Sequence, residues 1–191
     1  MIALLLIDIQ KGLDQSEHWG GSRNNPSAES NCREILDYFR SKNWPIFHIQ
    51  HCSTNPESPL FPGKQGHDIK AEVAPLEGEK VITKNTNSAF VGTALHELLT
   101  VGGIESLVIV GLTTDHCVSA TVRSSADLGF RPILVADATA TYSKTGFDGS
   151  LYEAQLVHSI SLASLKDEFA LIINTSTLLD KLEVSGPASF I

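Results

Sequence analysis

Residues 2–7 read Ile-Ala-Leu-Leu-Leu-Ile, an unbroken aliphatic run that ends at Asp8. A strand that is apolar at every position is typical of a parallel sheet with helices on both faces. Similar runs return further along the chain, at residues 45–50, 80–83, 107–110, 132–135 and 170–173. Helix-like segments alternate with them, at residues 28–42, 93–101, 118–128, 152–165 and 177–182. The alternation predicts an α/β fold, a three-layer α/β/α sandwich around a parallel sheet.

The chain has 191 residues, which is the size of one domain, and we expect a single domain over residues 1–191. Residues 52–78 interrupt the alternation, because they are rich in Pro and Gly and have little periodicity. A long irregular connection in a compact domain is usually a functional loop, and we expect this one to lie over a site. Residues 185–191 are expected to form a C-terminal extension at the surface or at an interface.

Composition narrows the possible partners and the compartment. The formal charge of −8 disfavours phosphate backbones and anionic lipid heads, so we expect no nucleic acid and no membrane as partners. Charged residues make up 19% of the chain against about 25% in typical domains, which suggests a surface covered by ligands or by other subunits. We expect a homo-oligomer, a dimer or a tetramer. Cys32, Cys52 and Cys117 form no CxxC pair, and the apolar start is too short for a signal sequence. We therefore expect a cytoplasmic protein.

Candidate reactive residues follow three of the expected strands. In an open parallel sheet, ligands bind beyond the carboxyl ends of the strands, and Asp8, Lys84 and residues 111–117 all come directly after a strand. Taken alone, Asp8 is expected to cap the following turn or to pair with a basic residue, and Lys84 to be a solvated side chain. Cys117 begins a helix, where the pKa of a thiol is lowered. Together, a carboxylate, a cation and a thiol predict an activated nucleophile.

Three stretches carry a resemblance to a known family. They are LLLIDIQ at residues 4–10, VITKNTNSAFVGTAL at residues 81–95, and VIVGLTTDHCVSATVRSSADLGFRPILVADATAT at residues 108–141. These stretches resemble the isochorismatase-like cysteine hydrolases, and the similarity extends to about Thr177. The resemblance implies a six-stranded parallel sheet of Rossmann-like order 3-2-1-4-5-6 and a catalytic triad of Asp8, Lys84 and Cys117.

The resemblance also implies a cis peptide bond between Leu112 and Thr113. In that family such a bond directs the amide of Thr113, together with the amide of Cys117, into an oxyanion hole. Family members hydrolyse amides, ureido groups and a vinyl ether. Because Cys117 is present, we expect hydrolysis of a C–N bond in a small-molecule amide through a thioester, with vinyl ether hydrolysis of the isochorismatase type as an alternative.

Other functions fit the sequence less well. A metal-assisted nicotinamidase resembles D-x-H followed by further histidines, but residues 49–53 read IQHCS, so His51 and Ser53 stand in the ligand positions. His48, Gln50 and His67 lie on different faces or on distant loop positions, and we expect no metal and no cofactor. A receiver-like phosphoacceptor switch would need an acidic cluster. A dinucleotide-binding oxidoreductase is disfavoured because no GxGxxG follows a strand.

The expected pocket is less closely specified. His51 ends its strand, and we expect it to hydrogen-bond the substrate. Trp19, Phe61 and Phe90 lie in loops that should overhang the site and give it apolar walls. His116 precedes Cys117, and neighbours on a helix point about 100° apart, so we expect it to face away. Cys32 and Cys52 are assigned to packing or mild exposure.

Overall fold

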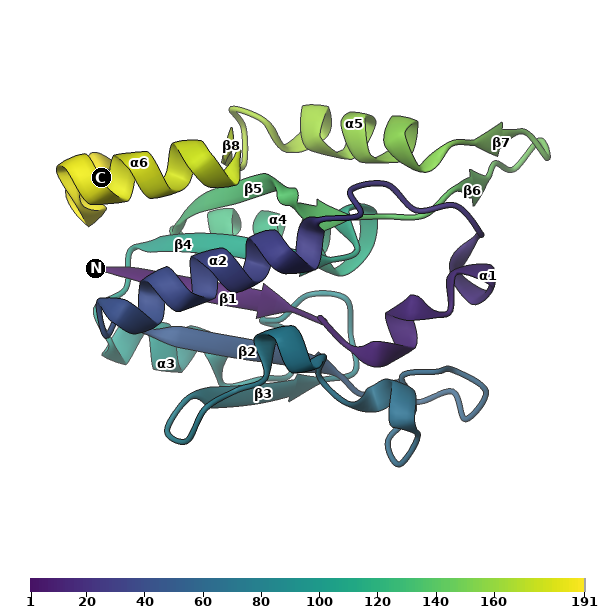
Figure 1. Ribbon diagram of the computed structural model, residues 1–191, viewed down its shortest axis with the longest axis horizontal. Helices are drawn as coiled ribbons and strands as arrows, with labels where there is room; N and C mark the ends of the chain where they lie inside the picture. Colours follow the sequence, from purple (N-terminus) through teal and green to yellow (C-terminus); the bar gives the residue numbers. More distant parts are fainter. Residues whose placement is uncertain (191) are drawn as a thin grey trace.

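The computed structural model describes residues 1–190 and has a parallel sheet with helices on both faces (Figure 1). The sheet order is β3-β2-β1-β4-β5-β8, and every neighbouring pair is parallel. These strands are β1 (Ile2–Ile7), β2 (Ile46–His51), β3 (Lys80–Lys84), β4 (Ser106–Leu112), β5 (Arg131–Ala140) and β8 (Leu171–Ile173). Counted along the chain, their order is 3-2-1-4-5-6, so the predicted sheet is confirmed.

Strand β1 contributes to two hydrophobic cores because its side chains alternate between the faces of the sheet. Leu4 and Leu6 pack with the helices of one face, and Leu5 and Ile7 pack with those of the other. The first face carries α2 (Ala28–Ser41) and α6 (Thr175–Ser185). The opposite face carries α3 (Leu95–Val101), α4 (Ser119–Asp127) and α5 (Ala154–Leu165). None of the helices within residues 1–190 has both the length and the apolar character of a membrane span.

Several boundaries differ from the sequence prediction where tertiary contacts override local pattern. The helix expected at residues 118–128 is preceded by a π-helical turn, Thr114–Val118. A short antiparallel pair, β6 (Lys144–Thr145) with β7 (Leu151–Tyr152), and a short helix α1 (Ser16–Trp19) were not expected.

The chain end also differs in part from the expected surface extension. The described part of residues 185–191 turns back, and Phe190 is buried in the core beside α2 and α6. Ser106, at the start of β4, donates a hydrogen bond to the backbone oxygen of Phe190 at 3.4 Å. Ile191 lies outside the described residues. The apolar Phe190 side chain therefore ties this segment to the sheet.

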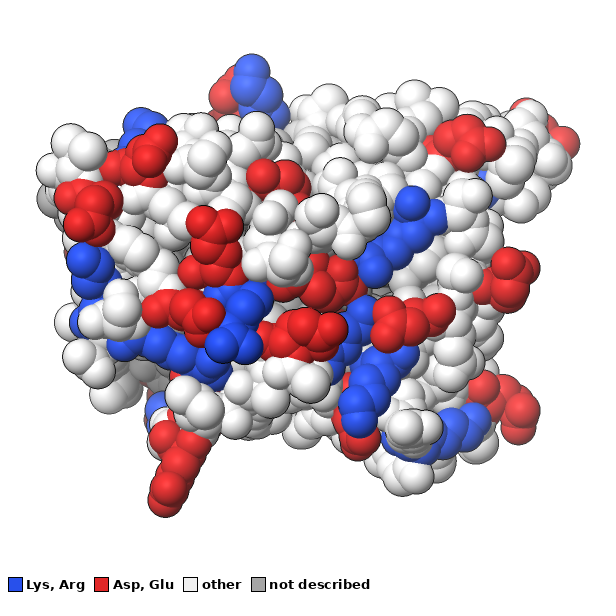
Figure 2. Space-filling model, viewed as in Figure 1, with Lys and Arg blue, Asp and Glu red and all other residues white. Residues whose placement is uncertain are grey.

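The charged surface around α2 is mixed in sign. On the face shown in Figure 2, Lys and Arg side chains are interspersed with Asp and Glu. Ion pairs account for this pattern, such as Arg40 with Glu79 at 2.7 Å and Lys70 with Glu29 at 2.7 Å. Positive and negative side chains on this face are therefore paired with one another.

Gly111 allows β4 to lie close against β1 where both strands approach the site. Its φ is +119°, and an added Cβ would lie 2.1 Å from the backbone oxygen of Ile7. The pairing of β4 with β5 also changes register between Ile109 and Gly111. A side chain at residue 111 would therefore push apart the two strands that carry Asp8 and Leu112.

We expect Gly111→Ala to destabilise the protein more than Gly129→Ala. Gly129 also has a positive φ, +87°, but an added Cβ there meets no atom within 4 Å, so it isolates the backbone cost. That cost is about 1–2 kcal/mol, and the clash with Ile7 adds a further ~1–3 kcal/mol. Urea unfolding of both variants measures the difference. Equal losses of stability would contradict the close approach of β4 to β1.

Candidate active site

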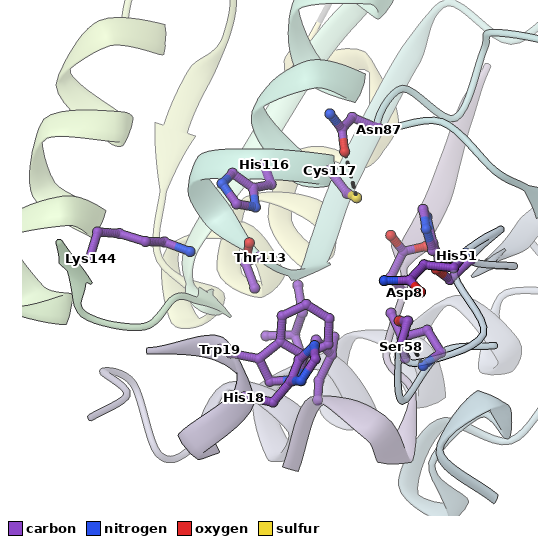
Figure 3. Close-up of a pocket in the computed structure, with 15 residues that line it drawn as sticks. Asp8, His18, Trp19, His51, Ser58, Asn87, Thr113, His116, Cys117 and Lys144 are labelled. Atoms are coloured by element: carbon purple, nitrogen blue, oxygen red, sulfur yellow. Dashed lines mark hydrogen bonds between the residues drawn. The ribbon is translucent and has the colours of Figure 1, made fainter. Parts of the chain in front are cut away.

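Four strands of the sheet bring their carboxyl ends together at the candidate site. Asp8 follows β1, His51 ends β2, Lys84 ends β3, and Cys117 lies in the π-helical turn after β4. Because β2 lies between β1 and β3, Lys84 reaches Asp8 across the end of β2, beside His51. Figure 3 shows Asp8, His51 and Cys117 facing one hollow.

The ammonium group of Lys84 is the centre of this cluster. Its Nζ lies 2.6 Å from Oδ2 of Asp8, 3.3 Å from Sγ of Cys117 and 3.2 Å from Nδ1 of His51. It also donates to the backbone oxygen of Thr86 at 3.1 Å. The side chains of Lys84 and Asp8 are 0% and 2% exposed. The structure thus brings together the three residues that the sequence placed at strand ends.

The resting thiol of Cys117 differs from the sequence expectation. Burial, followed by the neighbouring Asp8 carboxylate, raises the pKa of Cys117 above its ordinary value, while Lys84 opposes the shift. The expectation that a helix start lowers this pKa is therefore wrong, because desolvation of the thiolate outweighs the favourable charge. The thiol is protonated at rest, and a base must remove its proton before it can attack.

His51 is held as a neutral ring. Burial and the Lys84 ammonium lower the pKa of His51. Since an ammonium can only donate, Nδ1 of His51 accepts the hydrogen bond from Lys84, and the proton of the neutral ring resides on Nε2. His51 also lines the cavity beside the thiol. The ring therefore has one N–H that can donate to a bound molecule.

Gln10 fixes the backbone of His51, a role that the sequence analysis missed. Its fully buried side chain accepts from the backbone N–H of His51 at 2.8 Å and donates to the backbone oxygens of His51 at 3.0 Å and His67 at 2.8 Å. The position of Gln10 could have indicated this role, because a glutamine two residues after Asp8 is a polar residue at the end of an aliphatic strand. Gln10 thereby ties the end of β2 to the loop that follows it.

A cavity of about 260 Å³ opens above these groups. The irregular loop at residues 52–78 supplies part of its wall, as the sequence predicted for this segment. The other walls come from the segment after β1, the loop after β3, the turn after β4 and the start of β6. The lining residues are Asp8, Leu13, His18, Trp19, His51, Ser53, Asn55, Ser58, Leu60, Asn87, Leu112, Thr113, His116, Cys117 and Lys144.

The prediction of apolar cavity walls is only partly correct. Trp19 lines the cavity, and its Nε1–H donates to the backbone oxygen of Gly12 at 2.9 Å. Phe90 instead belongs to the hydrophobic core, where it stacks on Phe130 with ring centroids 5.8 Å apart. Phe61 is also outside the lining, because its loop turns Ser58 and Leu60 toward the cavity.

His116 lines the cavity, and the expectation that it faces away is wrong. The expectation assumed an α-helical step of about 100° between neighbours, whereas residues 114–118 form a wider π-helical turn. Cys32 is buried and Cys52 half-buried, and neither lines the cavity. Cys117 is thus the cysteine that faces this hollow.

Two buried oxygen atoms at the cavity have no hydrogen-bond partner among the described residues. They are Oδ1 of Asp8 and Oγ1 of Thr113. The peptide bond between Leu112 and Thr113 is cis. Asn87 also lines the cavity, and its Oδ1 lies 3.8 Å from Sγ of Cys117 (Figure 3). Buried polar atoms are normally satisfied, so these two oxygens keep hydrogen-bonding capacity beside the thiol.

Comparison with known proteins identifies the family of the chain. The model of the Isochorismatase domain matches residues 2–176 of the chain. The chain belongs to the isochorismatase family. It is 45% identical to the isochorismatase family protein YrdC of Bacillus subtilis, over 93% of this chain and 94% of that protein. An isochorismatase-family structure from Chromobacterium violaceum is 42% identical, covers 95% of this chain and 93% of its own, and superposes with a TM-score of 0.91.

A more distant relative has a named activity. The N-carbamoylsarcosine amidase of Arthrobacter is 30% identical over 69% of this chain and 56% of that protein. The relatives of this chain thus include an amidase as well as a protein named only for the family. The activity named for this relative is the hydrolysis of an amide-type bond.

Gln50 and His67, which the sequence analysis placed on different faces or at distant positions, contact each other in this isochorismatase-family chain, whereas His48 is engaged elsewhere. His48 lies 2.8 Å from Glu79, and Gln50 donates to the backbone oxygen of His67 at 2.9 Å. A carboxylate oxygen of Asp8, a ring nitrogen of His51 and Sγ of Cys117 do lie within 4.8 Å of one another. The Lys84 ammonium is within 3.3 Å of all three, however. A divalent ion among them would have to displace a buried cation.

We expect Asp8→Asn and Lys84→Met to change the pKa of Cys117 in opposite directions. Asp8 raises this pKa and Lys84 lowers it, so loss of the carboxylate increases the thiolate fraction and loss of the ammonium decreases it. At a pH below the pKa, a change of about one in the pKa alters that fraction about tenfold. The thiolate fraction of Cys117 is measured by the rate of alkylation with iodoacetamide at fixed pH. The Cys117→Ala protein gives the background rate of the other cysteines. Changes in the same direction would contradict the assigned electrostatics.

Proposed function

We propose that the protein hydrolyses a C–N bond in a small carboxamide through a thioester formed on Cys117. The observation that carries this proposal is the Lys84 ammonium, which contacts the carboxylate of Asp8 and the thiol of Cys117 in one buried cluster. A base, a cation and a thiol at one cavity are the components of an activated nucleophile. The amidase among the relatives supports the same type of reaction.

Acylation begins with the protonated thiol. Asp8 accepts the proton of Cys117 as Sγ attacks the carbonyl carbon, and Lys84 stabilises the negative charge that develops on sulfur. The backbone N–H groups of Thr113 and Cys117 stabilise the tetrahedral oxyanion. Asp8 then returns the proton to the departing ammonia or amine. The C–N bond breaks, and the acyl group stays on sulfur.

Deacylation reverses these roles. Asp8 takes a proton from water, the hydroxide oxygen attacks the thioester carbon, and the C–S bond breaks. The proton goes back to Sγ, which restores the thiol and releases a carboxylic acid. His51, with its proton on Nε2, donates a hydrogen bond to the substrate and so holds the carbonyl carbon in line with Sγ.

The alternative functions fit the site less well. A receiver-like phosphoacceptor site needs several carboxylates at one edge, whereas Asp8 is the acidic residue in the lining of this cavity. A metal-assisted nicotinamidase needs a ligand set, and Ser53 and Lys84 stand where such a set would form. Vinyl ether hydrolysis would leave the contact between Cys117 and Lys84 without a role. The thioester route uses every member of the buried cluster.

Cys117→Ala is expected to abolish amide hydrolysis while the protein stays folded. The substitution removes the nucleophile and changes little volume, and losses of this kind reach on the order of a millionfold in kcat. Ammonia release from a panel of small amides measures turnover, and intact mass after rapid quenching detects the acyl group on the wild-type chain.

Cys52→Ala is the matched control, because Cys52 lies outside the cavity and its loss should leave both signals in place. Appreciable turnover by folded Cys117→Ala protein would overturn the covalent mechanism. An acyl adduct that maps to Cys52 would overturn the assignment of the nucleophile.

Activity is expected to survive exhaustive chelation. The position among Asp8, His51 and Cys117 is filled by the Lys84 ammonium, which supplies the positive charge that a metal would otherwise bring. Dialysis against a strong chelator, followed by assay with and without added zinc, manganese or iron, tests this. Loss of activity that a metal restores would make His51 a ligand and would favour the nicotinamidase alternative.

A further inference from the structure

One end of the cavity is not used by the proposed chemistry. In the view of Figure 3, Cys117, Asp8 and His51 lie on one side of the hollow, and Lys144 extends into it from the other side, with Thr113 between them. Lys144 belongs to β6, which is far from the reacting residues in the sequence. A bound molecule that reacts at Cys117 and extends along the cavity therefore meets Lys144 at its other end.

Thr113 lies in the cavity wall between these two ends. The residue is only 7% exposed, and its Oγ1 has no hydrogen-bond partner among the described residues. An unsatisfied buried hydroxyl costs free energy, so its presence in a cavity wall points to a ligand atom that it binds. A hydroxyl can donate to an acceptor oxygen or accept from a donor, and its neighbours decide which.

Asp115 contacts two of the residues that line this end of the cavity, Lys144 and His116. It does not line the cavity, but its Oδ2 lies 3.5 Å from Nζ of Lys144 and 3.4 Å from Nε2 of His116. Its Oδ1 accepts a hydrogen bond from Oγ1 of Thr141. Burial raises the pKa of Asp115, but the Thr141 hydrogen bond and the charges of His116 and Lys144 outweigh it and lower the pKa overall. The carboxylate stays ionised and orients Lys144.

Lys144 keeps donor capacity for a ligand. Its contact with Asp115 is an ion pair at 3.5 Å, longer than a hydrogen bond, and its side chain is 28% exposed. An ammonium has three donors and no acceptor. Around Lys144 and Thr113, the groups free to bind a ligand are therefore donors, which suits an acceptor with negative charge.

We propose that Lys144 and Thr113 bind a carboxylate of the substrate, so that the protein acts on small monoamides of dicarboxylic acids. This inference rests on the proposed function, because it assigns the amide end to Cys117 and the acid end to Lys144. The apolar side chains of Leu13, Trp19, Leu60 and Leu112 line the same cavity and suit a short hydrocarbon segment between the two ends.

The first test compares matched substrates on the whole protein. Malonamate, succinamate and glutaramate each carry one amide and one carboxylate, and malonamide, succinamide and glutaramide are their neutral counterparts of nearly equal shape. We expect kcat/KM for the preferred acid to exceed that of its diamide by about 10- to 100-fold, the range of one charge-assisted contact. Equal values for acid and diamide would overturn the proposal and leave the amide chemistry intact.

The second test assigns the contacts. Lys144→Met should raise KM for the preferred acid about 10- to 100-fold with kcat changed less than about threefold, and KM for the diamide should stay the same. Thr113→Val, which keeps the shape of the side chain, should raise the same KM about tenfold. Lys166→Met is the control, since it removes one exposed positive charge, paired with Asp167, away from the cavity. An unchanged KM in Lys144→Met would overturn the assignment.

A binding measurement separates this inference from the proposed reaction. Calorimetry with succinamate or glutaramate on Cys117→Ala protein reports the carboxylate contact without turnover. Binding that is lost in the Cys117→Ala, Lys144→Met double variant supports the subsite even if no amide is hydrolysed, in which case the proposed function alone fails. Binding of the acid that is no tighter than binding of its diamide overturns the subsite.

Discussion

A buried ammonium group organises this molecule. Moving a charge out of water costs several kcal/mol, and the cost is offset only when the charge is paired and hydrogen-bonded. Lys84 meets that condition through Asp8, the backbone oxygen of Thr86, and weaker contacts to His51 and Cys117. Asp8 and Lys84 come from strands that are not neighbours in the sheet. The strand order is therefore a condition for the ion pair, and the ion pair fixes where those strands end relative to each other.

The same burial favours the protonated thiol of Cys117 over its thiolate. Sulfur is desolvated and faces a carboxylate, so the thiolate is disfavoured even with an ammonium 3.3 Å away. The net charge of the cluster without substrate is then zero, with one negative charge on Asp8, one positive charge on Lys84 and a neutral thiol. Proton transfer from sulfur to Asp8 keeps that total unchanged. Charges thus move within a fixed set of dipoles, and little reorganisation of the site is needed.

The sequence was sufficient for the framework of the fold and for the three residues that meet at the candidate site. Unbroken aliphatic runs such as residues 2–7 identify buried parallel strands, and the rule that sites lie beyond strand ends selects Asp8, Lys84 and Cys117. The walls of the cavity were harder to predict, because loops have no hydrophobic periodicity. Phe90 entered the core, and Lys144 lies on a two-residue strand that only its antiparallel partner defines. The homo-oligomer and the cytoplasmic location stay predictions from composition.

The division between strand ends and loops has an evolutionary consequence. Asp8, Lys84 and Cys117, to which we assign the reaction, lie at or directly after strand ends. Trp19, the pair Ser53 and Asn55, and Lys144 reach the cavity from three separate connections. A substitution in one connection alters the shape or charge of one wall, and the Asp8–Lys84 pair and the other walls stay as they are. Selection can therefore act on each wall in turn, so a lineage can change its substrate by small steps without passing through an inactive ancestor.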